Sequence, residues 1–203
     1  TGAIVEYTAT SGTRDLKSWT YTSATLKING ASGTFTLPAA KSVTNLTVAA
    51  GTFDPNGYLL TGSGTLSVTD TILVDAATFD ESYTGFATTT LNTGSTVNYS
   101  ASGAQTVLAT DYYDLTLSGS GAKTVNPATT TISHTGTISG TAQVLLTVNA
   151  VGVDKTYDAT DAATVTLSVN NIFTAYAVSP SAVYTATFDA GQNIGAGKAI
   201  SVS

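Results

Sequence analysis

Apolar and polar residues alternate along most of the chain in short runs of about four to six residues. Turn-forming residues (Gly, Asn, Asp and Pro) separate these runs, and helical periodicity is nearly absent. Alternation with a period of two places successive side chains on opposite faces of a strand. The pattern therefore predicts an all-β protein. Examples of the predicted strands are residues 25–28 (TLKI), 45–48 (NLTV), 65–68 (TLSV), 96–99 (TVNY) and 114–117 (DLTL).

The predicted strands recur at a regular spacing. Leu46, Leu66, Leu91, Leu115 and Ile138 follow one another at intervals of roughly 20 to 25 residues, each in a similar strand. Short strands and tight turns at this period favour a β-solenoid, in which each coil buries its inward side chains against the neighbouring coils. A β-sandwich also has many short strands and is the alternative.

Both ends of the chain depart from this spacing. Residues 1–24 contain the single tryptophan, Trp19, and the single arginine, Arg14. We expect this segment to cap the first coil and cover its edge. The repeat disappears after the apolar run at 144–148, so we place a solenoid or sandwich domain at residues 1–148 and a second domain at 149–203.

Two segments frame the second domain. Residues 154–165 read DKTYDATDAATV, and residues 188–202 read FDAGQNIGAGKAISV. They resemble the opening and closing signatures of the YDG repeat, an immunoglobulin-like (Ig-like) domain of large bacterial surface proteins. Ala159 replaces the usual glycine of the aromatic-Asp-Gly triplet, and Asp161 replaces a threonine. The resemblance implies a small Ig-like β-sandwich. The YDG repeat normally continues past its closing signature with a further strand or two, so we expect this sandwich to lack its last strand.

Residues 91–99 and 113–121 are similar to the degenerate solenoid coils of filamentous-haemagglutinin-like adhesins. The two resemblances together imply an extracellular stalk, adhesin or filament, and they supply no catalytic residues. The chain begins at Thr1 without an initiator methionine, and we expect a mature or excised segment. The open edge of an incomplete sandwich has two explanations. One is truncation, and the other is a strand from another molecule, added by donor-strand complementation to build an open fibre.

Charge and composition narrow the class of partner. Charged residues make up 10% of the chain, against about 25% in typical proteins, and hydroxyl residues replace them. The net charge of −6 disfavours nucleic acid and anionic membrane surfaces, which both need clustered Lys and Arg. There is no cysteine and no apolar stretch of about 20 residues that could span a membrane. We expect an extracellular cell-surface protein whose partners are itself, neighbouring domains or surface glycans.

The candidate catalytic groups are few. His134 is the only histidine, and no serine lies in a nucleophile-elbow pattern, which argues against a Ser-His-Asp hydrolase and against a zinc site. Paired carboxylates about 5 to 9 Å apart hydrolyse glycosides. However, each pair abuts a turn, where Asp is favoured for backbone hydrogen bonding. Cleavage of a polysaccharide by elimination would also need Lys or Arg near the acids, and only Lys123 is close in sequence. We expect no enzyme, and a carbohydrate-binding or polysaccharide-degrading solenoid is the alternative. The pairs are Asp70 with Asp75, Asp80 with Glu81, and Asp111 with Asp114.

Several binding features remain as hypotheses. Asp154, Asp158 and Asp161 are the candidates for a calcium site, with turn capping as the alternative, and no other cofactor is expected. Asn45 and Asn98 begin glycosylation sequons. The tyrosines are candidates for stacking on sugars or for covering the sheet. Ice binding is disfavoured because the consecutive threonines at 88–90 and 129–131 point to opposite faces.

Overall fold

The structure is a computed structural model that describes residues 2–18, 20–145, 148–156, 158–173, 175, 185–189 and 199–202. The chain is 57% strand and 2% helix, so the prediction of an all-β protein is confirmed. It divides into two compact units. The first comprises Thr1–Leu145 with Ile172–Ala175, and the second comprises Leu146–Asn171 with Tyr176–Ser203.

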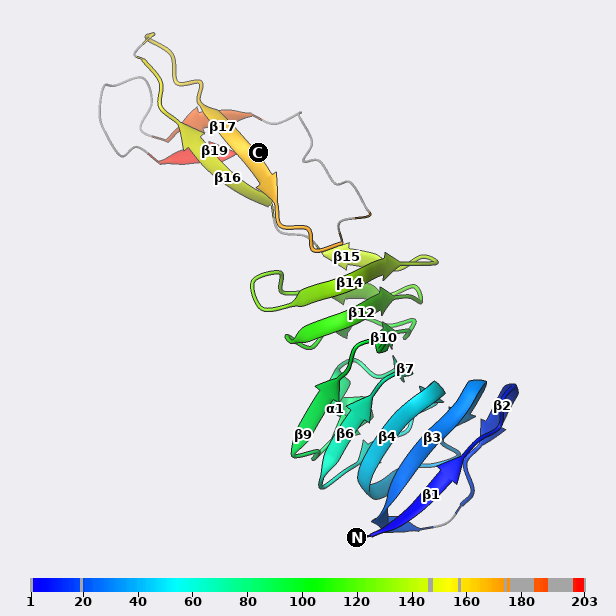
Figure 1. The fold of residues 1–203 in the computed structure, drawn as a ribbon. Coiled ribbons are helices and arrows are strands. Elements are labelled where there is room, and N and C mark those ends of the chain that lie inside the picture. Colours follow the sequence, from blue (N-terminus) through cyan, green and yellow to red (C-terminus); the bar gives the residue numbers. More distant parts are fainter. Residues whose placement is uncertain are drawn as a thin grey trace. The chain divides into compact units, whose positions relative to one another are not determined.

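The first unit is a β-solenoid of about seven turns, as predicted, and not a sandwich (Figure 1). Its first strands are β1 (Ala3–Tyr7), β2 (Gly12–Asp15), β3 (Tyr21–Thr36), β4 (Lys41–Asp54) and β5 (Leu60–Thr61). The middle part holds β6 (Thr65–Val68), β7 (Thr71–Val74), the short helix α1 (Phe79–Ser82), β8 (Tyr83–Thr84), β9 (Thr88–Leu91) and β10 (Thr96–Tyr99). The last part holds β11 (Gln105–Thr106), β12 (Asp111–Leu117), β13 (Ala122–Thr124), β14 (Thr131–Ile138) and β15 (Gln143–Leu145).

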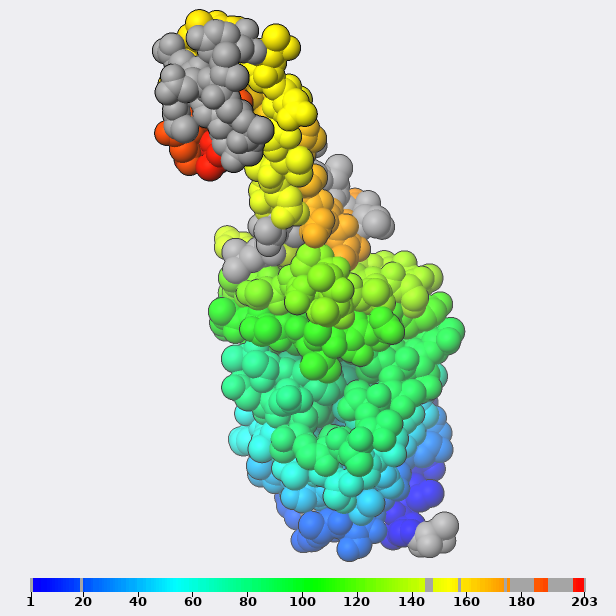
Figure 2. Space-filling view, turned by 90° about the vertical axis from the view of Figure 1, so that its left-hand side faces the viewer, coloured from blue at the N-terminus to red at the C-terminus, as the bar shows by residue number. Residues whose placement is uncertain are grey.

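Parallel pairing of successive coils builds this unit. The main sheet runs in the order β1-β3-β4-β7-β10-β12-β14, with β2, β5, β6, β8 and β9 attached beside it. A smaller sheet has the order β11-β13-β15. Within the described part of this unit, every strand pairing is parallel. The colours of Figure 2 accordingly change in successive bands through this unit, because the chain advances by one coil at a time.

Inward side chains of successive coils lie in register and form continuous columns. Leu26 pairs with Leu46, and Leu46 pairs with Leu66, so one coil follows the next after 20 residues here. A second column joins the coils through the strands that follow. The side chains of both columns are fully buried up to Leu115, and each contributes roughly 1.5 to 3 kcal/mol of hydrophobic stabilisation. The second column consists of Phe35, Phe53, Ile72, Val97 and Leu115.

The corner of β4 requires glycine. Gly51 has a φ of +90°, and a Cβ added there would lie 2.3 Å from the carbonyl oxygen of Gly30 in the preceding coil. A residue with a side chain would be strained in its backbone and would collide with the neighbouring coil. The corner can therefore stack tightly only because both coils carry glycine at this point.

The structure adds detail to two expectations about the solenoid. In the segment expected to cap the first coil, β1 and β2 pair in parallel with β3 and so cover the edge of that strand, while Trp19 lies outside the described residues. The proposed alignment of five leucine-like positions holds for Leu46 and Leu66. Leu91 pairs instead with Val68, and Ile138 pairs with Leu117. A shift of two residues keeps each side chain on the inward face, so alternation alone does not detect it.

The far end of the solenoid is covered by a returning segment of the chain. Phe173, from the segment Ile172–Ala175, is fully buried in the first unit. A Cβ added to Gly136 of β14 would lie 2.8 Å from the Phe173 ring and 2.9 Å from Ile132. Glycine at this inward position therefore leaves the space that the phenylalanine ring fills.

The second unit pairs its strands in the antiparallel sense. β16 (Val148–Val153) pairs with β17 (Thr164–Val169), and β18 (Ala186–Phe188) pairs with β19 (Ile200–Val202). A bridge between Ala162 and Thr187 links the two pairs. Tyr157 and most of the closing signature, at 190–198, lie outside the described residues. The Ig-like sandwich therefore stays a prediction.

Among the described residues, none of the helices has the length and apolar character needed to cross a membrane.

We expect Leu46→Ala to lower the free energy of unfolding by about 3 kcal/mol, because it opens a cavity between two coils in a fully buried column. Leu59→Ala is the control, since Leu59 is 36% exposed and its replacement should cost less than about 1 kcal/mol. Urea unfolding followed by circular dichroism measures both values. Equal losses in the two variants would contradict the stacked-column description.

Candidate functional site

The outer surface of the solenoid carries a column of threonines in register. Thr13, Thr34, Thr52, Thr71 and Thr96 pair one after another on five successive coils. Asp114 and Thr135 continue the column on β12 and β14. Each threonine of the column comes from a different coil. The consecutive threonines at 88–90 and 129–131, on which the sequence analysis relied, therefore did not predict the column. Paired strands lie roughly 4.8 Å apart, so each coil adds one threonine to the column at about this backbone spacing.

Asn45 belongs to a second outward column. Its Nδ2 donates to Thr25 Oγ1 of the preceding coil at 3.0 Å, and its Oδ1 accepts from the backbone N of Thr65 in the next coil at 2.7 Å. The side chain of Asn98, the other sequon asparagine, accepts at Oδ1 from Ser118 Oγ at 2.8 Å. Both side chains thus make hydrogen bonds between coils in the folded chain.

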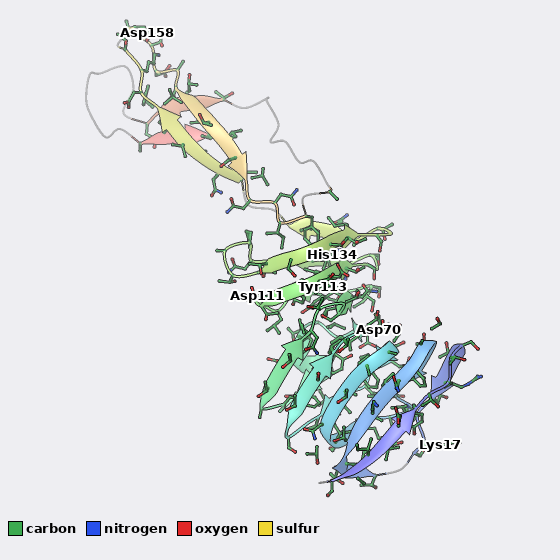
Figure 3. The ribbon with its side chains drawn as sticks, in the orientation of Figure 1. Lys17, Asp70, Asp111, Tyr113, His134 and Asp158 are labelled. Carbon is green, nitrogen blue, oxygen red and sulfur yellow. The ribbon has the colours of Figure 1, made fainter. Side chains whose placement is uncertain are left out.

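An aromatic pair with flanking carboxylates lies on the outer face of β12 and β14. The rings of Tyr113 and His134 stack with centroids 4.8 Å apart and planes 13° from parallel. Asp114 accepts a hydrogen bond from His134 Nδ1 at 2.7 Å and another from the backbone N of Thr135 at 2.8 Å. Figure 3 shows Tyr113 and His134 close together on these strands, with Asp111 beside them. We call Asp111, Tyr113, Asp114, Thr131 and His134 the aromatic cluster.

An irregularity in strand pairing creates this cluster. Tyr112 pairs with Ile132 and Asp114 pairs with Thr135, so the β14 strand holds one more residue than β12 between these pairs. On β12, Tyr113 and Asp114 are both half-buried between the fully buried Tyr112 and Leu115. Strict alternation would turn only one of them outward. The bulge therefore places Tyr113, Asp114 and His134 on the same surface.

The other paired carboxylates bind backbone and hydroxyl groups at turns. Asp70 accepts from the backbone N of Gly51 at 2.7 Å and from Thr71 Oγ1. Asp75 accepts from the backbone N of Gly57 and from Ser82 Oγ.

Glu81 takes part in a capping box at the start of α1. Its Oε2 accepts from the backbone N of Ala77, while Thr78 Oγ1 accepts from the backbone N of Glu81. Asp80 lies beside it in the same turn of helix. Glu81 therefore holds the helix end.

The calcium candidates do not converge in the described structure. Asp158 forms an ion pair with Lys155 at 2.8 Å and accepts hydrogen bonds from the backbone N and Oγ1 of Thr160. The backbone carbonyl of Asp161 accepts from the backbone N of Phe188. Across the residues that the structure describes, no group of three or more His, Cys, Asp or Glu side chains could hold a metal ion.

Lys123 lies inside the solenoid. It is fully buried, and its Nζ donates to the carbonyl of Ala101 at 2.8 Å and to Gln105 Oε1 at 2.5 Å. Gln105 Nε2 donates in turn to the carbonyls of Val74 and Ala76. The two side chains thus link three coils, and burial lowers the pKa of Lys123. Sequence reasoning treated this lysine only as a base near the carboxylates.

Two pairs of tyrosines form the same motif at different coils, which sequence reasoning missed. The Tyr7 and Tyr21 hydroxyls lie 2.6 Å apart. The Tyr7 hydroxyl accepts a hydrogen bond from the backbone N of Lys17, and the Tyr21 hydroxyl donates to the backbone carbonyl of Lys17. Tyr99 and Tyr112 bind the backbone of Leu108 in the same way. Burial raises the pKa of Tyr99 to about 12 and also raises those of Tyr21 and Tyr112.

A sequence signal for this motif was available. Residues 7–21 and 99–112 both begin with Tyr, followed by a hydroxyl residue and Ala, and both end with a Tyr that lies five residues after a buried apolar residue, Leu16 or Val107. These four tyrosines therefore tie a loop to the coil, whereas Tyr113 stacks on His134 in the aromatic cluster.

No family model, curated protein or solved structure matches the chain. The functional interpretation therefore depends on the geometry of the chain itself.

Lys123→Met should remove a pH dependence of stability. Because the folded-state pKa of Lys123 is lowered, the folded chain loses this proton before the unfolded chain does, and the contribution of this residue to stability rises as the pH increases toward the ordinary lysine value of 10.5. Urea unfolding between pH 7 and 9, below the ordinary tyrosine value of 10, should show this rise in wild type and in Lys17→Met, whose lysine is exposed, but not in Lys123→Met. A rise of the same size in Lys123→Met would refute the assignment.

The carboxyl of Asp158 should titrate unusually low. Hydrogen bonds from Lys155 and Thr160 lower its pKa to about 2. A lowered folded-state pKa stabilises the fold above the ordinary value of 3.8, and that contribution is lost as the pH falls toward 2. NMR titration should give the low value in wild type and a higher value in Lys155→Met, still below 3.8 because the Thr160 hydrogen bonds remain. Since the pair is exposed, 1 M salt should weaken the shift as well.

Proposed function

We propose that this chain is an extracellular structural and adhesive module of a cell-surface protein. The observation that carries the proposal is the in-register column of hydroxyls on the outside of a solenoid with a continuous apolar interior. Such a unit extends by adding coils and presents the same outer chemistry on each one. That combination suits a spacer which holds a binding surface away from the cell.

The charge distribution supports an extracellular role. With only 10% charged residues and a net charge of −6, the surface depends on neutral hydroxyls for its solubility. A neutral, hydrated surface avoids non-specific attraction to charged polymers. The resemblance to YDG repeats and to haemagglutinin-like coils points to the same role, and neighbouring domains of the same protein would be the direct partners.

The local roles of the carboxylates favour a structural role over hydrolysis. Asp70, Asp75 and Glu81 each bind backbone N–H groups at turns, where they stabilise the coil. Asp111 and Asp114 lie at the aromatic cluster, where they accept hydrogen bonds from Thr131, His134 and Thr135. We therefore propose no catalytic role for these residues.

Surface display tests the spacer role. One, two or three copies of the full chain are placed between a bacterial surface anchor and an epitope, with Gly/Ser linkers of equal residue number as controls. A stacked solenoid should carry the epitope further from the cell with each copy, while a flexible linker gains reach only with the square root of its length. Binding of antibody-coated beads measures the accessibility.

Two results would overturn the proposal. One is bead binding no better with the chain than with the linkers, in copies that circular dichroism shows to be folded. The other is release of reducing sugar from polysaccharides that is lost in Asp111→Ala, because turnover would identify an enzyme.

A further inference from the structure

We propose that the aromatic cluster on β12 and β14 is a docking site for neutral glycans. This inference deepens the proposed adhesive role and rests on it. The ligand class is a chain of uncharged hexose sugars, bound at the outer surface of the solenoid.

The stacked rings provide the platform. Tyr113 and His134 lie 4.8 Å apart in nearly parallel planes, and the imidazole side chain is 57% exposed. Sugar rings present C–H groups on their faces, and flat aromatic surfaces take up such faces in water. Tyr113 lies on β12 and His134 on β14, and these strands pair in parallel, so main-chain pairing between two coils positions both rings.

Carboxylates flank the platform and can orient a sugar. Asp114 holds His134 at Nδ1, and Asp111 Oδ1 accepts from Thr131 Oγ1 at 2.5 Å. Each carboxylate has acceptor sites beyond these bonds, because two oxygens accept about four hydrogen bonds. Sugar hydroxyls are suitable donors. Ligand sites generally combine an apolar surface with a small number of convergent polar groups.

Charge selects neutral sugars over acidic ones. The cluster holds two acidic side chains, Asp111 and Asp114, and the chain as a whole carries a formal net charge of −6. A uronic acid or sulfated sugar would be repelled by this surface, whereas an uncharged hexose would not.

The threonine column lets a glycan chain extend beyond the cluster. Asp114 lies in register between Thr96 and Thr135, and Thr116 lies between Asn98 and Thr137. A polysaccharide that lies along the stack therefore meets a new hydrogen-bonding side chain roughly every 4.8 Å. Single contacts on such an open surface are weak, and many copies on one cell would bind together through avidity.

The experiment uses the full chain and immobilised oligosaccharides. Neutral β-glucan, galactan and mannan fragments are compared with polygalacturonate fragments. Wild type should bind at least one neutral series in preference to polygalacturonate. Tyr113→Ala and His134→Ala should each lower the affinity at least tenfold, while Tyr113→Phe, which keeps the ring, should retain it. Tyr58→Ala removes a tyrosine that is 42% exposed elsewhere and serves as the matched control.

Circular dichroism melting of each variant separates lost binding from lost folding, and His134→Ala, at an exposed position, keeps the test available if Tyr113→Ala unfolds. The inference is wrong if wild type binds none of the neutral fragments, if it prefers polygalacturonate, or if folded Tyr113→Ala and His134→Ala bind as wild type does. Those outcomes leave the display experiment unaffected, so failure of the glycan site and failure of the spacer role are distinguishable.

Discussion

In the solenoid unit, each coil pairs with the next in parallel and in register, and the rest of the unit depends on this pairing. It aligns inward side chains, so that Leu26, Leu46 and Leu66 form one buried column. The same pairing aligns outward side chains, which turns one threonine per coil into the column from Thr13 to Thr96. No coil could bury its apolar face alone, so stability and surface chemistry both arise from stacking.

Two buried polar residues inside the solenoid, Gln105 and Lys123, lie on the short strands β11 and β13. Lys123 and Gln105 bind three backbone carbonyls on two neighbouring coils that would otherwise be buried without partners. The two tyrosine pairs do the same for the loops at Lys17 and Leu108. A solenoid with irregular corners thus needs internal hydrogen bonds in addition to apolar columns. These bonds also explain why most of its tyrosines are structural.

The proposed binding site depends on a local departure from the regular ladder. A regular β12 would expose either Tyr113 or Asp114, and a regular β14 would not bring His134 to the same surface. The bulge at this pair of strands exposes all three side chains without disturbing the buried Tyr112 and Leu115 beside them. The extra residue lies on β14, where it brings His134 to the surface that carries Tyr113 and Asp114 of β12.

The sequence by itself determined the strand content, the solenoid period and the equivalence of Leu46 with Leu66, because alternation and spacing are local properties of the chain. Tertiary structure decided the remaining register. Leu91 and Ile138 are offset by two residues from the expected column, and a two-residue shift leaves alternation unchanged. Tertiary structure also decided that β1 and β2 pair with β3, and that the rings of Tyr113 and His134 stack. These depend on which backbone groups of distant segments pair, and that pairing is settled by the packing of all coils together.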